Sequence, residues 1–379
     1  MHKPAGNIRI AFSVTNCICF DQRVLKIVGV IRELGCNVTI IGRRRDHQCG
    51  SGSVPFRTKR FRMIFKRGFL FYKFYNIRLF FYLLFHKSDL LVSNDLDTLL
   101  ANYLVSKLKK VPLVFDSHEY FTGVPELKGR SFVTWVWKIV EKKIFPRLKY
   151  VMTVSDSVAE QYEKEYVIKP VVIRNCSQFS GKIDALLRSD LGIKEDHLLL
   201  VFQGGGINID KGGEELIDAI GITENISLLV VGSGDVLPVM MKRAEELNLS
   251  DRVKFIPKMP WIEMMRYTKS ADAGLCIEKD TNLNYRFSLP NKLFDYISAG
   301  IAVIASGLPE VREVVEGYDC GIIIPAVTPE EISKAIIKFR DDRGLLNKLT
   351  QNAVTASESL NWETESKIVI DFYKPILNI

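Results

Sequence analysis

The chain has 379 residues, a formal net charge of +8, and a composition that is 47% hydrophobic and 25% charged, which is typical of a globular protein with two domains. It lacks an uninterrupted apolar run of about 18 residues, and seven cysteines in a chain of this length do not make a disulfide framework. The short polar segment 1–6 leads directly into a strand pattern, so we expect no signal peptide and a reducing, cytoplasmic compartment.

Apolar runs and helical periodicities alternate along the whole chain. In the first half we predict strands at 8–14, 38–42, 89–93, 112–115, 150–154 and 171–174, and helices at 22–34, 68–86, 97–109, 132–146 and 156–165. In the second half we predict strands at 198–203, 227–231, 253–256, 273–277, 302–305 and 320–323, and helices at 211–220, 235–247, 261–269, 290–298, 308–316, 328–340 and 343–356. This alternation indicates an α/β fold with two Rossmann-like parallel-sheet domains joined near 176–182. Ligands of such sheets bind beyond the carboxyl ends of the strands, so the cleft between the domains is the expected site.

The charge is unevenly distributed along the chain. Residues 1–175 hold 30 Lys and Arg against 14 Asp and Glu, a formal charge of +16, and the remainder carries −8. The segment 57–87 holds nine Lys and Arg, no acid and many aromatic residues. That composition suits an anionic membrane surface, and it also suits a helix on the sheet with a basic solvent face. A nucleic-acid groove is a third reading, but no RNA-binding signature accompanies it, so we predict no nucleic acid partner.

The stretch 286–306 reads as a loop, a helix, a glycine turn and a buried strand. Pro290 stands where the helix begins and Gly300 where it ends, and a helix N-terminus suits an anion such as a diphosphate. Lys292 and Asp295 are three residues apart and share one face near that end. We predict that Asp295 accepts hydrogen bonds from a ribose diol, the alternative being an acid on the helix surface. The combination indicates a nucleotide-sugar site.

Two glycine-rich turns follow strands in the second half. Three glycines allow close approach of the backbone to a phosphate, and Lys211 stands at the start of the next helix. The alternative is a flexible loop with a solvated lysine. In VVGSGD the turn at Gly232 is more typical of a structural turn, which we expect to edge the nucleotide pocket. The three glycines are Gly204, Gly205 and Gly206.

The ordered set of motifs resembles family 4 (group 1) glycosyltransferases, which have the GT-B fold. The matching segments cover nearly the whole chain and include 20–42, 93–100, 112–121, 151–155, 202–212, 230–235 and 286–306. The resemblance implies that residues 1–177 form an acceptor domain and residues 178–359 a nucleotide-sugar donor domain facing it across the cleft. It also implies that residues 360–379 form a helix that packs back on the first domain.

The resemblance implies a donor site and shows two departures from the family. Lys211 matches a diphosphate ligand, but a glycine stands where the family usually has an Arg several residues earlier. We hypothesise that Lys292 replaces that charge. The first acid of the family's E-x7-E pattern falls on Phe287, which puts the contacts to the donor hexose in doubt. The other implied donor contacts are the backbone around Lys258 and Met259 for the base, the amides of Ser288 and Leu289 for phosphate or sugar oxygens, and Pro290 and Asn291.

His118 lies just past a strand end in FDSHEYF. It matches the histidine near the reacting sugar in the family, so we predict that it positions the donor sugar or the acceptor. The alternative is a histidine satisfied locally by Asp116 or Glu119. We place Asn16, Asn94, Glu119 and Glu126 on the acceptor side, although either glutamate equally suits a solvated loop.

The triplet Asp95-Leu96-Asp97 looks like a D-x-D metal clamp, but it precedes a helical pattern. There Asp97 is a natural N-cap and Asp95 favours the helix dipole. GT-B enzymes generally need no metal bridge, so we predict no metal and no cofactor beyond the nucleotide-diphosphate sugar.

The sequence therefore predicts a retaining, metal-independent hexosyltransferase with His118, Lys211 and Lys292 as catalytic residues. The donor is of UDP or GDP type, and the acceptor is lipid-linked or a polysaccharide or lipopolysaccharide. The basic segment 57–87 places the enzyme peripherally at the inner face of a bacterial cytoplasmic membrane. Two alternatives stay open. One is a nucleotide-sugar epimerase on the same fold, for which no clear set of catalytic carboxylates is visible. The other is a non-catalytic assembly subunit that binds nucleotide or glycan; the two departures keep this alternative open, and the presence of Lys211, Asp295 and His118 argues against it.

Overall fold

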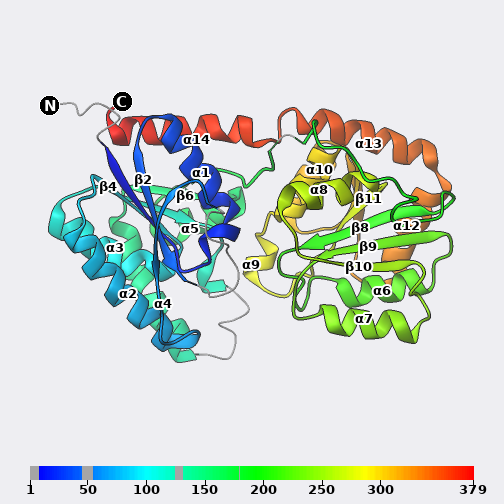
Figure 1. Ribbon diagram of the computed structural model, residues 1–379, viewed down its shortest axis with the longest axis horizontal. Helices are drawn as coiled ribbons and strands as arrows, with labels where there is room; N and C mark the ends of the chain where they lie inside the picture. Colours follow the sequence, from blue (N-terminus) through cyan, green and yellow to red (C-terminus); the bar gives the residue numbers. More distant parts are fainter. Residues whose placement is uncertain (1–7, 45–53, 124–130, 179) are drawn as a thin grey trace. The chain divides into compact units, whose positions relative to one another are not determined.

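The computed structural model describes residues 8–44, 54–123, 131–178 and 180–379, which divide into two compact units (Figure 1). Unit 1 comprises Met1–Arg174 and Ser366–Ile379, and unit 2 comprises Asn175–Glu365. The predicted boundaries, after residues 177 and 359, lie a few residues from these.

Unit 1 is built on a sheet of seven parallel strands in the order β3-β2-β1-β4-β5-β6-β7. The strands are β1 Arg9–Ser13, β2 Asn37–Arg43, β3 Arg57–Phe61, β4 Leu90–Asn94, β5 Leu113–Ser117, β6 Tyr150–Thr153 and β7 Val171–Val172. The connecting elements are α1 Gln22–Glu33, α2 Gly68–Phe85, α3 Leu96–Lys109, α4 Ser131–Ile144 and α5 Asp156–Tyr166, with short 3-10 turns η2 Ile18–Phe20, η3 Phe121–Gly123 and η5 Phe145–Arg147. Most of α14 Trp362–Leu377 also belongs to this unit.

Unit 2 is built on a sheet of six parallel strands in the order β10-β9-β8-β11-β12-β13. The strands are β8 Leu198–Gly204, β9 Ile226–Gly232, β10 Val253–Pro257, β11 Ala273–Cys276, β12 Ala302–Ser306 and β13 Gly321–Ile324. The helices are α6 Gly213–Gly221, α7 Leu237–Glu246, α8 Trp261–Ser270, α9 Leu283–Arg286, α10 Asn291–Ala299, α11 Pro309–Gly317, α12 Pro329–Asp341 and α13 Arg343–Ser357.

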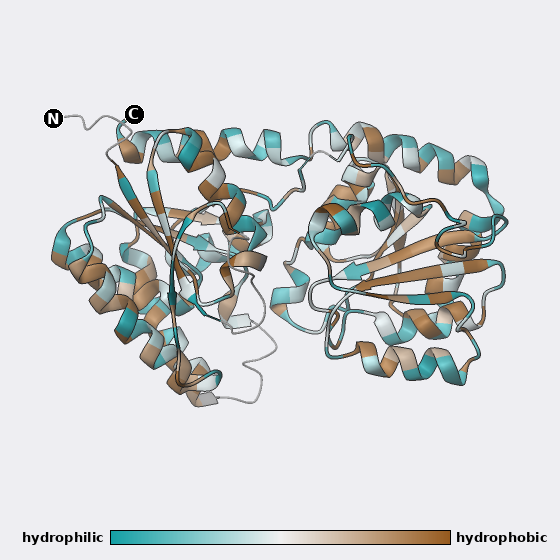
Figure 2. Ribbon diagram, viewed as in Figure 1, coloured by the Kyte–Doolittle hydropathy of each residue, from teal (hydrophilic) through white to brown (hydrophobic). Residues whose placement is uncertain are grey.

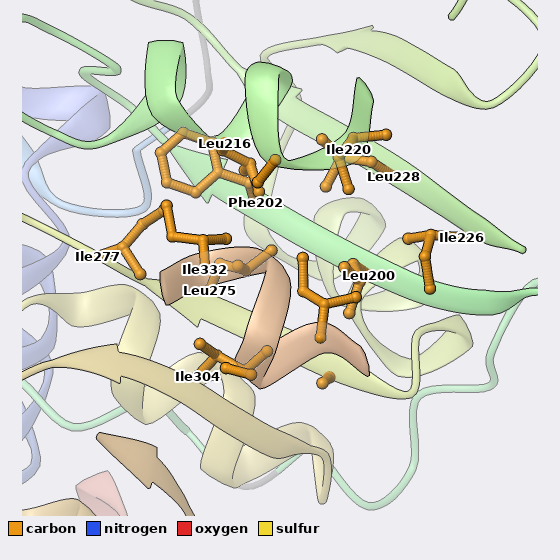
Figure 3. Close-up of a cluster of buried hydrophobic side chains, with 14 of the residues drawn as sticks. Leu200, Phe202, Leu216, Ile220, Ile226, Leu228, Leu275, Ile277, Ile304 and Ile332 are labelled. Atoms are coloured by element: carbon orange, nitrogen blue, oxygen red, sulfur yellow. The ribbon is translucent and has the colours of Figure 1, made fainter. Parts of the chain in front are cut away.

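Alternate side chains of β8 point to opposite faces of the unit 2 sheet, because side chains in a strand have a period of two. Leu200 and Phe202 join a core with α6, α7 and α12, and this core contains Leu216 and Ile332 (Figure 3). Leu199 and Val201 face the other way, into a core with α8, α10 and α11. Helices therefore cover both faces, which explains why the strands read as continuous apolar runs; these runs are visible as brown arrows in Figure 2.

The strand order reverses at one point in each sheet, between β1 and β4 in unit 1 and between β8 and β11 in unit 2. In open parallel sheets, ligands bind beyond the carboxyl ends of the strands at such points. Asn94 and His118 lie at or just after the carboxyl ends of β4 and β5, and Lys211 follows β8. The topology thus brings the main candidate residues to these two edges.

The predicted elements of both halves are present, with ends that coincide or are shifted by one or two residues. Two elements are additional, the edge strand β3 and the single-turn helix α9. Within the described part of the chain, no helix is long and apolar enough to span a membrane.

Candidate functional site

The glycine-rich loop after β8 is held by a second glycine turn after β9. The amide of Ser233 donates to the carbonyl of Gly204 at 3.1 Å, and the amide of Ile207 donates to the carbonyl of Ser233 at 2.8 Å. A Cβ on Gly232 would lie 1.9 Å from the Gly204 carbonyl oxygen, and one on Gly234 would lie 2.1 Å from that of Ile207. The two turns therefore stack backbone against backbone, and this packing alone requires glycine at position 232.

Lys211 directly precedes the N-terminus of α6 and is pressed against the segment after β11. Gly212 has a φ of 80°, and a Cβ there would lie 2.3 Å from the carbonyl oxygen of Ile277. The Lys211 Nζ lies 3.6 Å from Oε1 of Glu278 and 4.1 Å from the ring centroid of Tyr285. Burial lowers the pKa of Lys211, while the negative charge of Glu278 opposes that shift.

Lys292, in the first turn of α10, reaches the same carboxylate oxygen. Its Nζ lies 3.1 Å from Oε1 of Glu278 and 4.5 Å from the ring centroid of Phe202. Glu278 is only 1% exposed; burial alone would raise its pKa, but Lys292 and Lys211 lower the pKa to about 2. The structure therefore brings together the two lysines that the sequence proposed as diphosphate ligands, and it places between them an anion that the sequence did not indicate.

Asp295 is not the helix-surface acid that was considered as the alternative to a ribose ligand. It is buried at 6% exposure, and its carboxylate accepts hydrogen bonds from Ser177 Oγ at 2.5 Å, Trp261 Nε1 at 2.8 Å and Gln203 Nε2 at 2.9 Å. The prediction of a surface acid as the alternative is therefore wrong, because three donors from three segments hold the carboxylate inside unit 2. Its role toward ribose stays a prediction, to which the structure adds a role in packing.

In the turn that leads into α10, some of the groups predicted to bind phosphate already make hydrogen bonds within the protein. The amide and the hydroxyl of Ser288 both donate to the carbonyl of Tyr285, at 3.0 and 2.8 Å. A phosphate contact at that amide would require this bond to break. Leu289 is buried in the core below, Pro290 is the N-cap of α10, and Asn291 accepts a hydrogen bond from Asn175 at 2.9 Å.

Lys258 and Met259 follow β10 at the same edge of the sheet. Lys258 is exposed, and its Nζ would lie 3.8 Å from a Cβ on Gly205 in the glycine loop. Met259 is half-buried against the core below. A Cβ on Gly206 would meet only the Asn208 side chain, at 3.5 Å, so the outer part of the loop is open. Contact of this backbone with a base stays a prediction.

A second polar cluster lies at the carboxyl edge of the unit 1 sheet. His118 Nδ1 lies 3.4 Å from Asp95 Oδ2, and His118 Nε2 lies 3.4 Å from Asp116 Oδ2. Asp116 is fully buried, and its carboxylate accepts hydrogen bonds from Nε and Nη2 of Arg23 at 3.0 and 2.7 Å. Burial alone would lower the pKa of His118, but Asp95 and Asp116 raise it to about 10, so the ring is an imidazolium at neutral pH. The local partner Asp116 considered for this histidine is therefore present.

Asp95 and Asp97 exchange the positions that the sequence suggested. Asp95 is the N-cap of α3, has a φ of 60°, and makes no side-chain cap to the helix; its Oδ1 instead accepts the amide of His118 at 2.8 Å. Asp97 lies in the first turn and accepts a hydrogen bond from the Thr15 hydroxyl. The prediction of Asp97 as N-cap is wrong because the helix begins at Leu96, which places Asp97 inside its first turn. Burial and the charge of Asp95 raise the pKa of Asp97 well above its usual range.

The acceptor-side candidates are placed differently from one another. Asn94 is buried and donates to the Ser13 carbonyl at 3.0 Å, whereas Asn16 is exposed after β1. Glu119 is half-buried beside His118, and Glu126 lies outside the described residues. Within the described segments, the buried Oδ1 atoms of Asn94 and Asp97 have no hydrogen-bond partner.

No sequence motif singles out Arg23 and Glu278, the two residues that organise these clusters. Arg23 reads as a solvated base on an amphipathic helix, yet it is 3% exposed and pairs with a residue 93 positions away. Glu278 is one acid in a charged loop. Its one available signal is its place directly after the buried strand β11, at the edge where ligands bind.

Two family descriptions match this chain. Residues 184–355 match the glycosyl transferases group 1, and residues 22–176 match glycosyltransferase family 4. Together they span most of the chain, which therefore belongs to the group 1, family 4 glycosyltransferases and is a glycosyltransferase.

Individual relatives agree with this assignment. The chain is 26% identical to an uncharacterized glycosyltransferase of Methanocaldococcus jannaschii, over 74% of this chain and 72% of the relative. It is 29% identical to the chitobiosyldiphosphodolichol beta-mannosyltransferase of Debaryomyces hansenii, over 67% of this chain and 60% of the relative.

Solved structures show the same fold. Sucrose-phosphate synthase from Thermosynechococcus elongatus superimposes with a TM-score of 0.79 at 18% identity, covering 98% of this chain and 100% of that one. Anabaena HepE in complex with UDP-glucose superimposes with a TM-score of 0.76 at 15% identity, covering 97% and 100%. The fold is thus GT-B, as the resemblance implied.

Proposed function

We propose that this glycosyltransferase moves a hexose-type sugar from a nucleoside-diphosphate sugar, of UDP or GDP type, to a lipid-linked or polysaccharide/lipopolysaccharide acceptor. The observation that carries the donor part is the convergence of Lys211 and Lys292 on one point, within 3.6 and 3.1 Å of a single oxygen. We further propose retention of configuration and independence from metal, which rest on the family resemblance.

The chemistry needs stabilisation of a leaving diphosphate as the glycosidic bond breaks. Two ammonium groups fixed in a partly buried site act more strongly than they would in water, and they need no rearrangement at the moment of reaction. The UDP-glucose complex of the structural neighbour HepE supports a donor of this class. The His118 imidazolium in unit 1 offers a fixed positive charge for positioning the donor sugar or the acceptor.

The acceptor side is supported by unsatisfied atoms in unit 1. A buried acceptor atom without a partner costs free energy, on the order of 1–3 kcal/mol. The Oδ1 atoms of Asn94 and Asp97 are two such atoms at the carboxyl edge of the sheet. Hydroxyl groups of a sugar are natural partners for them.

A lipid-linked acceptor is supported by an apolar surface on two helices that pack against each other, α2 and α3. Buried side chains of α2 form one stripe, yet a second stripe of large apolar residues on this helix is exposed, and α3 adds three exposed leucines. Segment 57–87 also holds nine Lys and Arg and no acid. Such a surface suits an anionic membrane, and the Debaryomyces relative is named for a diphosphodolichol compound. This α2–α3 surface comprises Leu70, Phe74, Ile77, Phe81, Phe85, Leu100, Leu104 and Leu108.

The donor proposal is tested by thermal shift with UDP, GDP, ADP, dTDP, CMP and their common sugars. We expect one nucleotide to stabilise the protein, by about 2.7 kcal/mol at a hundredfold excess over Kd. Lys211→Ala should abolish the shift, whereas the exposed Lys334→Ala on α12 should retain it. The active donor should also release free nucleotide slowly by hydrolysis, equally with and without EDTA. No shift with any nucleotide would favour the non-catalytic assembly subunit.

A further inference from the structure

Glu278 occupies the point where the two donor-site lysines meet. One oxygen, Oε1, faces both ammonium groups, and each ammonium also lies over an aromatic ring, Lys211 over Tyr285 and Lys292 over Phe202. Ring and carboxylate together fix each cation from two sides. The three charges sum to +1, although a nucleotide sugar brings two negative charges on its diphosphate.

The two lysines are not held equally. Lys292 lies closer to Glu278, at 3.1 Å, with 11% of its side chain exposed. Lys211 lies at 3.6 Å with 19% exposed. The weaker and more accessible contact is therefore the one that an incoming phosphate can replace at the lower cost.

Without the carboxylate, two ammonium groups would face each other in a poorly solvated site. Like charges disfavour each other's ionised form, and burial adds to that effect. Burial and then Lys292 lower the pKa of Lys211, and Glu278 is the largest opposing influence. Glu278 thus keeps Lys211 protonated when no donor is bound.

The neighbouring titratable groups do not share this task. Cys276 of β11 donates to Glu278 Oε2 at 3.4 Å, and burial raises the pKa of its thiol well above the usual range. Tyr296 of α10 is also kept neutral, because burial raises its pKa. Lys279 is turned away to Glu215, with Nζ 2.5 Å from Oε1. None of these three neighbours therefore supplies a charge that would compensate for the loss of Glu278 beside Lys211.

We propose that Glu278 is the internal counterion of the donor site, a positioning residue that holds Lys211 and Lys292 in place and yields Lys211 to the diphosphate when the donor binds. The inference rests on the proposed donor function of these lysines. At low pH, Glu278 should lower the affinity for the donor, because its negative charge offsets a positive charge of the lysines. At high pH, Glu278 should raise the affinity, because it keeps a lysine protonated.

The test is the binding of UDP-glucose and GDP-mannose to wild type and Glu278→Gln by calorimetry at pH 6, 7.5 and 9. The diphosphate of a nucleotide sugar keeps its charge over this range, so changes report the protein. We expect Glu278→Gln to bind at least threefold more tightly than wild type at pH 6 and at least threefold more weakly at pH 9. A Kd ratio that is the same at every pH would overturn the inference, since a purely structural role would weaken binding uniformly.

Asp272→Asn is the matched control, because Asp272 precedes the same strand at its opposite end and pairs with Arg188 at 2.8 Å. We expect it to lower the melting temperature and leave the Kd ratio flat with pH. If Glu278→Gln does not fold, the charge-conserving variant Glu278→Asp takes its place. Binding by Glu278→Asp that depends on pH as in wild type would support the counterion role. A Kd that is changed from wild type by the same factor at every pH would overturn it. If wild type binds neither sugar nucleotide, the donor proposal fails first and this inference with it.

Discussion

Asp295, which we predict to bind ribose, already accepts several hydrogen bonds from its own protein. Three donors from Ser177, Gln203 and Trp261 converge on one carboxylate. Loss of nucleotide binding in an Asp295 variant would therefore not separate a ribose contact from a loosened fold. Stability must be measured beside binding.

We predict that Asp295→Ala lowers the free energy of unfolding by about 2–4 kcal/mol, because buried donors lose their acceptor. Urea unfolding followed by tryptophan fluorescence measures this, and Trp261 is itself part of the network. Asp251→Ala, at an exposed turn of the same unit, should change stability by less than about 0.5 kcal/mol. An Asp295→Ala protein as stable as wild type would remove the packing role.

The His118 cluster predicts a particular pH dependence. The pKa of His118 is about 10 in the folded protein and about 6.5 as an ordinary histidine, so its pairing contributes stability that is fully present below pH 6.5 and is lost as pH rises toward 10. In wild type, this pairing makes the free energy of unfolding larger at pH 6 than at pH 10. We expect that difference between the two pH values to be smaller in His118→Asn by more than about 1 kcal/mol.

Urea midpoints at pH 6, 8 and 10 measure that difference, with His86→Asn as control, because His86 is exposed after α2. Equal pH profiles for His118→Asn and wild type would contradict the charged pairing.

Asp116 affects stability at acid pH. Arg23 and His118 lower its pKa, so its contribution to stability is present above the ordinary pKa of about 4 and is lost in acid.

At the residue scale, the two lysines proposed for the donor site could be singled out from the sequence, whereas the carboxylate that lies between them could not. Lys211 and Lys292 stand beside glycine turns and helix starts, which are local signals. Arg23 has no local signal, and the one local signal of Glu278 is its place after a strand end, because both residues act through partners that are distant in the sequence and that only folding brings near. Long-range pairing of charges is invisible in the periodicity of a single sequence.

At the scale of elements, the central strands could be predicted because they are buried on both faces and therefore consist of continuous runs of apolar residues. The missed strand β3, RTKRF, is an edge strand with exposed basic side chains. Charged side chains on an edge strand discourage pairing with other chains. They also remove the apolar pattern by which a strand is recognised in a sequence. The single turn of α9 is too short to have a helical period.

The α2–α3 surface leads to a prediction about membranes. We expect Phe81→Asp, on α2, to reduce co-sedimentation with anionic liposomes at least fivefold, because it places a charge where apolar contact is needed. Wild type should bind anionic liposomes and not neutral ones, and its binding should fall as salt rises.

Val354→Asp is the matched control, since Val354 is an exposed apolar residue of α13 in unit 2. We expect it to bind liposomes as wild type does. Equal loss in both variants would indicate a general effect of added negative charge, and no binding of wild type to either kind of liposome would remove the membrane proposal.

At the scale of the whole molecule, the two units have separate sheets and formal charges of opposite sign, and we predict that they bind different partners. We predict that a nucleotide sugar slows hydrogen exchange mainly at 204–212 and 278–292, and that anionic liposomes slow it mainly in α2 and α3. Mass spectrometry of peptic peptides measures both. Protection by the nucleotide confined to unit 1 would overturn the assignment of the donor site.

Phe202 joins two properties that are usually treated as separate. Its ring lies in the hydrophobic core of unit 2 (Figure 3) and also beneath the ammonium of Lys292. Substitutions that repack this core for thermostability would therefore also change an electrostatic contact of the proposed donor site. Selection on turnover would constrain an interior position that never meets solvent.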